Sequence, residues 1–179
     1  MERSLRFALS AMLLASSVAW AGQFEDGLAA MERGDYIKAA TLFQPLATAG
    51  NALAQYNLGL MYEKGRGVPQ DYAGAVSLYQ LAAAQGNAEA QRNLGVMYRD
   101  GLGVQKDPVR AHMWLNLGAA ESAANAASYR DALVKTMKPE QIVLAQKLAN
   151  ECRQRGFKGC DSPQSARPAG PAAASPEAQ

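Results

Sequence analysis

Apolar side chains recur three and four residues apart in two stretches of the chain, which is the spacing of one face of an α-helix. These residues are Ala54, Leu58, Met61 and Tyr62, and then Ala90, Leu94, Met97 and Tyr98. After each stretch comes a second apolar face, made by Ala75, Leu78 and Ala82 in one case and by Ala111, Trp114 and Leu117 in the other. The pattern therefore predicts two pairs of helices that pack through their apolar faces.

Two glycines interrupt the first helix of each predicted pair. Gly59 and Gly95 lie inside helices, where a glycine costs about 1 kcal/mol relative to alanine. Their presence in corresponding places indicates that a neighbouring helix approaches the backbone closely there.

Residues typical of helix ends stand at the expected boundaries. Asparagine and aspartate can accept hydrogen bonds from the free amides of a first turn, and glycine can end a helix in the left-handed conformation. The predicted start caps are Asn51, Asp71, Asn87 and Asp107, and the predicted end residues are Gly65 and Gly101. No strand precedes the Gly-x-Gly-Val links at 65–68 and 101–104, and no Lys-Ser or Lys-Thr follows them. We therefore interpret them as interhelix turns and not as phosphate-binding loops.

The two pairs of helices are copies of one unit. When residues 52–87 are aligned with residues 88–123, 16 of the 36 positions are identical. The same offset reaches backward, since Asp35, Tyr36 and Ala39 match Asp71, Tyr72 and Ala75. The chain thus has three units, the first with a shortened opening. A single unit cannot bury its apolar faces alone, so stacked units are expected to form an α-solenoid.

The pattern Ala-x-x-x-Leu-Gly-x-x-Tyr-x-x-Gly-x-Gly-Val-x-x-Asp-x-x-x-Ala, at 54–75 and again at 90–111, resembles the Sel-1-like repeat, a relative of the tetratricopeptide repeat. The resemblance implies an all-α solenoid that binds another protein. Exported bacterial members are similar in serving as adaptors, regulators of envelope signalling or partners that neutralise toxins.

The predicted divisions are a signal peptide at 1–21, a degenerate tetratricopeptide-like repeat at 22–51, Sel-1-like repeats at 52–87 and 88–123, closing helices at 124–160, and a disordered tail rich in Pro, Ala and Ser at 161–179. At Lys138 the chain departs from the threonine usual in such closing helices, which removes the expected cap.

The first 21 residues have the order of a secretory signal. A short basic start at Arg3 and Arg6 precedes an apolar run of 12 residues, 7–18, interrupted only by small serines. Ala19-Trp20-Ala21 provides small residues for cleavage after position 21. An uncleaved anchor is the alternative, but the run is shorter than the roughly 20 residues that cross a bilayer. We expect a periplasmic or secreted protein without stable membrane insertion.

Cys152 and Cys160 are the two cysteines of the chain. An oxidising compartment favours a disulfide between them. The alternatives are a reactive thiol or a metal site, and a metal needs about four ligands. The single histidine, His112, is distant in sequence, and no metal or other cofactor is predicted.

The solenoid is expected to be curved, and the predicted partner-binding residues lie on its concave face, which the first helices form. They are Asn57, Leu60 and Lys64, matched one unit later by Asn93, Val96 and Asp100. Asparagines facing a groove can hydrogen-bond the backbone of an extended peptide. In the alternative interpretation, Asn57 and Asn93 join neighbouring units. The partner is expected to be a protein or peptide of the cell envelope.

Charge and motifs argue against other classes of function. The net charge is +2, with basic and acidic residues interspersed, which gives no surface for nucleic acid. Ser-x-x-Lys and Gly-x-Ser-x-Gly are absent, and His112 has no catalytic partner at a suitable spacing, so a helix-surface or packing role is favoured for it. The prediction is therefore a non-enzymatic protein. The alternative is a β-lactam-binding or hydrolysing enzyme, as suggested for cysteine-rich members of the family.

Overall fold

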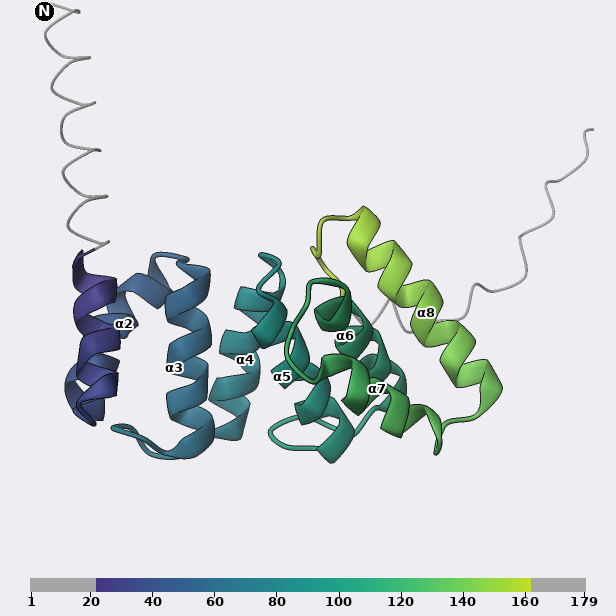
Figure 1. Ribbon diagram of the computed structural model, residues 1–179, viewed down its shortest axis with the longest axis horizontal. Helices are drawn as coiled ribbons and strands as arrows, with labels where there is room; N and C mark the ends of the chain where they lie inside the picture. The colour runs from purple at the N-terminus through teal and green to yellow at the C-terminus, as the bar shows by residue number, and fades with distance from the viewer. Residues whose placement is uncertain (1–21, 162–179) are drawn as a thin grey trace, which may run out of the picture.

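The computed structural model describes residues 22–161, and every regular element within them is an α-helix. The predicted signal peptide and residues 162–179 of the predicted tail lie outside the described residues. After a first helix at 22–32 come α2 (Tyr36–Thr48), α3 (Ala52–Lys64), α4 (Tyr72–Ala83), α5 (Ala88–Asp100), α6 (Pro108–Ala120), α7 (Ala126–Val134) and α8 (Pro139–Gln154). From α2 to α7, successive helices pack side by side in a row along the long axis of the molecule (Figure 1), so the all-α solenoid is confirmed.

The helix ends form as the sequence predicts. The Asn51 and Asn87 side chains accept hydrogen bonds from the third amides of α3 and α5, at 2.9 and 2.8 Å. The Asp71 and Asp107 carboxylates each accept two amides of the following turn. At Lys138 the missing side-chain cap is replaced in part, because the Gln141 side chain accepts the Lys138 amide at 3.0 Å.

The glycines inside the first helices mark close helix contacts. A methyl group placed on Gly59 would lie 2.8 Å from the Tyr79 ring, and one on Gly95 would lie 2.7 Å from Leu115 Cγ. Both contacts join the two helices of one unit, which confirms the predicted close approach.

The link between the two helices of a unit touches the unit before it. Gly103 has a φ of +67°, and a methyl group there would lie 2.3 Å from the Tyr72 carbonyl at the start of α4. Gly67 makes the same approach to Tyr36 at the start of α2. Glycine is needed at both positions because the backbone conformation and the space exclude a side chain.

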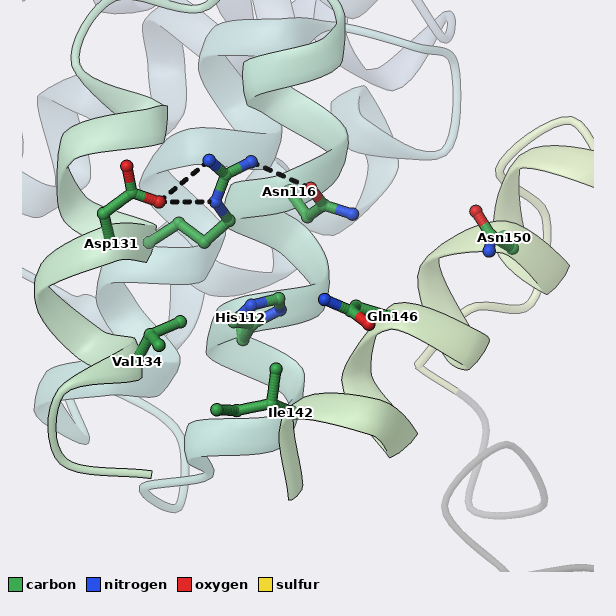
Figure 2. A pocket seen from close by; sticks show the side chains of 8 residues that line it. His112, Asn116, Asp131, Val134, Ile142, Gln146 and Asn150 are labelled. Carbon is green, nitrogen blue, oxygen red and sulfur yellow. Dashed lines mark hydrogen bonds and ion pairs between the residues drawn. The ribbon is translucent and has the colours of Figure 1, made fainter. Parts of the chain in front are cut away.

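The closing helices both pack on α6 but scarcely contact each other. Between them they leave a space of about 530 Å³, which we call the α6 cavity (Figure 2). It is lined by His112, Asn116, Arg130, Asp131, Val134, Ile142, Gln146 and Asn150.

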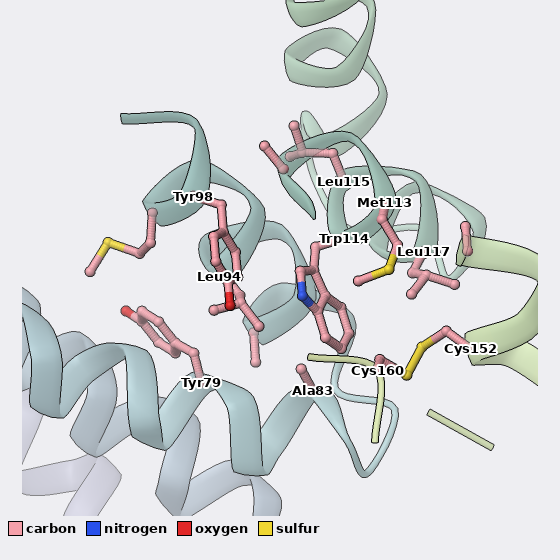
Figure 3. Close-up of a cluster of buried hydrophobic side chains, with 14 of the residues drawn as sticks. Tyr79, Ala83, Leu94, Tyr98, Met113, Trp114, Leu115, Leu117, Cys152 and Cys160 are labelled. Atoms are coloured by element: carbon pink, nitrogen blue, oxygen red, sulfur yellow. A yellow bond between two sulfur atoms is a disulfide. The ribbon is translucent and has the colours of Figure 1, made fainter. Parts of the chain in front are cut away.

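The larger of two apolar clusters runs from α4 to the end of α8 and includes Trp114 (Figure 3). On α4, Ala75 and Ala82 are fully buried as predicted, whereas the predicted Leu78 is only partly buried and packs against the smaller cluster. Tyr79, which was not predicted, is fully buried in the larger cluster. The smaller cluster joins the first helix, α2 and α3 around Phe43.

The chain after α8 folds back over the second and third units. Cys152 and Cys160 form the expected disulfide. Beside it, the Asp161 carboxylate accepts a hydrogen bond from Trp114 Nε1 at 2.9 Å and is also hydrogen-bonded by Tyr98 and Gln80. Burial raises the pKa of Asp161. This residue, which composition assigns to the tail, therefore joins the closing turn to α4, α5 and α6.

Candidate partner-binding site

A cavity of about 260 Å³ opens on the face formed by the first helices of the second and third units. We call it the α3–α5 cavity. Its lining comes from α3, α5, the link after α5, and α7, and consists of Leu60, Glu63, Lys64, Arg92, Asn93, Val96, Met97, Leu102 and Tyr129. The helical repeat of three to four residues on α3 and α5 brings these side chains to one face, and α7 closes the end of the cavity.

Four of the six residues predicted to bind a partner line this cavity: Leu60, Lys64, Asn93 and Val96. The other two lie outside its lining. The Asn57 amide donates to the Leu53 carbonyl of its own helix at 2.8 Å, and the Asp100 carboxylate is held by the Arg99 guanidinium at 2.7 Å. The Arg99 hydrogen bond also lowers the pKa of Asp100.

Asn93 belongs to a polar network beneath the cavity. The Tyr79 hydroxyl donates to Glu63 Oε2 at 2.7 Å, and the Asn93 side chain hydrogen-bonds the same hydroxyl. Burial, followed by the Glu63 carboxylate, raises the pKa of Tyr79 well above its usual value. Since these residues come from α3, α4 and α5, Asn93 connects two units as well as lining the cavity. The residue of the first unit that corresponds to Tyr79 is Phe43, which offers no hydroxyl to Asn57.

Comparison with protein families identifies these units. The sequence model of the Sel1 repeat matches residues 16–51, 52–87 and 88–122. The chain belongs to the Sel1 repeat family. The first matched Sel1 repeat begins at residue 16, inside the segment predicted as a signal peptide. Sel1 repeat proteins are typically protein-interaction modules, and their fold is generally a non-catalytic scaffold.

Solved structures show the same Sel1 repeat architecture. The crystal structure of c5321, a protective antigen of uropathogenic Escherichia coli strains with an SLR fold, is 26% identical, with a TM-score of 0.73 over 80% of this chain and 32% of c5321. The chain thus spans about a third of the length of that relative. A Sel1 repeat protein from Oxalobacter formigenes is 31% identical, with a TM-score of 0.59 over 71% of this chain and 98% of the other. A search of curated proteins gave no match.

Two residues of the α3–α5 cavity, Glu63 and Tyr129, were not predicted from the sequence, whereas Arg92 stands at a position where the two units differ. Glu63 was not predicted because its counterpart in the next unit is Arg99, so a carboxylate does not recur at this position of the repeat. Arg92 forms an ion pair with Glu89 at 2.8 Å. Tyr129 belongs to α7, beyond the repeats, and its ring lies 5.2 Å from the Arg99 guanidinium carbon.

The lining combines apolar and polar side chains. Leu60, Val96, Met97 and Leu102 supply the apolar surface, and the exposed Lys64 ammonium pairs with Glu63. Such a site can take up an apolar side chain of another protein and surround it with polar contacts. Within residues 22–161, no group of three or more His, Cys, Asp or Glu side chains is placed to hold a metal ion.

Proposed function

We propose that the protein is an exported interaction module that binds a segment of a partner protein in the α3–α5 cavity. The observation that carries the proposal is the cavity itself, where apolar and polar side chains from two successive repeats and the closing helix α7 line one hollow. Partner segments commonly anchor an apolar side chain in such a hollow while polar groups at the rim remain hydrated. Adaptor, envelope-signalling regulator and toxin-neutralising partner are the roles that suit this mode of binding.

Export to the periplasm or the medium is the second part of the proposal. The order of basic, apolar and small residues over 1–21 supports it, and a disulfide between Cys152 and Cys160 is typical of an oxidising compartment. The mature chain is expected to begin at Gly22. Cell fractionation with sequencing of the mature N-terminus tests this, and a cytosolic chain that retains Met1 would contradict it. Among residues 22–161, no helix is both long enough and apolar enough to cross a bilayer.

Site-specific photocrosslinking in the native cell identifies the partner. A photoreactive residue at Val96, in the cavity, is compared with one at Ile37, which is 72% exposed on α2. The partner sought is the protein captured from Val96 and not from Ile37.

Paired variants of α3 then test whether that partner occupies the cavity. Leu60→Glu places a carboxylate among the apolar residues of the lining, and we expect the affinity for the captured protein to fall about tenfold or more. Leu53→Glu introduces the same charge on the same helix at a residue that is 52% exposed and outside the lining, so affinity should be retained. Circular dichroism checks that both variants are folded. Equal binding by the two folded variants would refute the proposed site.

A β-lactam-hydrolysing enzyme is the alternative function. Incubation of the purified, disulfide-bonded protein with a chromogenic β-lactam distinguishes this enzyme from a non-enzymatic interaction module. Steady turnover would contradict the non-enzymatic proposal.

A further inference from the structure

The α6 cavity is a second candidate site, separate from the α3–α5 cavity. Its floor is the face of α6 that lies between the diverging helices α7 and α8 (Figure 2). Residues from all three helices line it, and most of them are polar.

The charges in this lining cancel. The Arg130 guanidinium donates to Asp131 Oδ1 at 2.8 and 2.9 Å and to Asn116 Oδ1 at 3.0 Å. Burial and then the Arg130 charge lower the pKa of His112, which favours a neutral imidazole near pH 7. An ionic ligand would find no unpaired opposite charge among these groups, so the lining suits an uncharged polar ligand.

Free amide groups stand on the α8 wall of the cavity. Gln146 and Asn150 are exposed, and neither side chain forms a hydrogen bond with another residue of 22–161. Each amide offers a carbonyl acceptor and an N–H donor, which are the two groups that a peptide backbone presents. Both amides are therefore available for a backbone ligand.

The spacing of these amides matches an extended chain. Gln146 and Asn150 are one helical turn apart, about 6 Å along the axis of α8. An extended peptide advances about 6.6 to 6.8 Å for every two residues. The two amides can thus bond alternate residues of a strand lying along α8. Ile142, one turn earlier, and Val134 on α7 add apolar surface at one end of the cavity.

His112 lies at the wall of the same cavity. It is 2% exposed, and its Nδ1 is buried without a hydrogen-bond partner in the described part of the chain. Figure 2 shows the Gln146 amide directed toward the His112 ring across the cavity. Buried polar atoms are nearly always hydrogen-bonded, so His112 adds a polar group to the wall beside Gln146, but its buried Nδ1 is given no contact with the ligand.

From these observations we propose that the α6 cavity binds a short, uncharged, extended segment of another protein through its backbone. Gln146 and Asn150 bond alternate residues of the segment, and Val134 and Ile142 receive one of its apolar side chains. The protein would then hold two binding surfaces, one on the Sel1 repeats and one between α6 and the closing helices.

The test uses a capped peptide of alternating serine and valine, titrated to millimolar concentration into the isotope-labelled, disulfide-bonded protein. We expect shifts of the Gln146 and Asn150 side-chain amide signals in heteronuclear NMR spectra. The double variant Gln146→Leu/Asn150→Leu should weaken binding about tenfold, because two neutral hydrogen bonds are lost. Gln44→Leu, the same change at an exposed glutamine of α2, should bind like the unchanged protein.

Two N-methylated forms of the peptide test recognition of the backbone. Methyl groups on one set of alternate amides should abolish binding, while methyl groups on the other set should leave it. Equal effects of the two forms, full binding by the double variant, or no shift of the two amide signals would each overturn the proposal. Maltohexaose is the comparison ligand, and its binding in place of the peptide would identify a carbohydrate site and also overturn it.

Discussion

Removal of the Tyr79 hydroxyl by Tyr79→Phe should measurably destabilise the junction of the second and third units. A hydrogen bond to a charged group contributes about 1.5 to 3 kcal/mol. The Glu63 side chain retains 18% exposure and can regain water, which reduces the expected loss to about 1 to 2 kcal/mol. Urea denaturation followed by circular dichroism measures this change as a lower transition midpoint at an unchanged slope.

Tyr72→Phe is the matched control, because the Tyr72 hydroxyl accepts only an exposed hydrogen bond from Gln70, at 3.0 Å. We expect this variant to lose less than about 0.5 kcal/mol. A double-mutant cycle of Tyr79→Phe with Glu63→Gln should show a coupling of about 1 kcal/mol, since the two side chains share one hydrogen bond. Equal losses in the two tyrosine variants, together with no coupling, would refute the role of the network.

Three further changes test other parts of the fold. Burial lowers the pKa of His112, so the free energy of unfolding should fall as the pH drops below about 6.5, by at most about 1.4 kcal/mol per pH unit. In denaturation measured from pH 7 to 5, His112→Gln should weaken this pH dependence, and an unchanged dependence would contradict the reasoning. Reduction of the Cys152–Cys160 disulfide should lower the free energy of unfolding by about 2 to 3 kcal/mol, seen as a lower urea midpoint with reductant. Gly103→Ala should lower the free energy of unfolding by about 3 kcal/mol or more in the same assay. Gly34 also has a positive φ but no atom within 4 Å of an added methyl group, so Gly34→Ala should lower it by only about 1 kcal/mol. Equal losses would show that the contact between units is unimportant.

Local rules predicted the helix ends well. The caps at Asn51 and Asn87 follow from bonds between a side chain and the next turn, so neighbouring residues suffice to place them. The sequence did not predict the burial of Tyr79, because it lies about 100° around the helix from Leu78 and the apolar spacing favoured Leu78. The close packing of the Tyr79 ring against Gly59 of α3 buries it, while Leu78 packs against the smaller cluster.

The repeat was a weaker guide to the candidate site than to the fold. Asn57 and Asn93 occupy equivalent places, yet a Phe at position 43 and a Tyr at position 79 give them different surroundings. Tyr129 reaches the α3–α5 cavity from outside the repeats, so internal symmetry contains no sign of it. Residues that identify a unit therefore establish the scaffold, and the differences between units shape the surface.

The folded-back turn after α8 has a consequence for how the molecule opens. Arrays of repeats fray from their ends, since a terminal unit has only one neighbour. Here Asp161 is bonded to Trp114 of α6 and to Tyr98 of α5, and the disulfide links this turn to α8. Release of α8 from the end of the solenoid must therefore also break the hydrogen bonds of Asp161 to α6 and α5. Hydrogen exchange should accordingly be slower in α8 than in the first helix, and unravelling should begin at the N-terminal end.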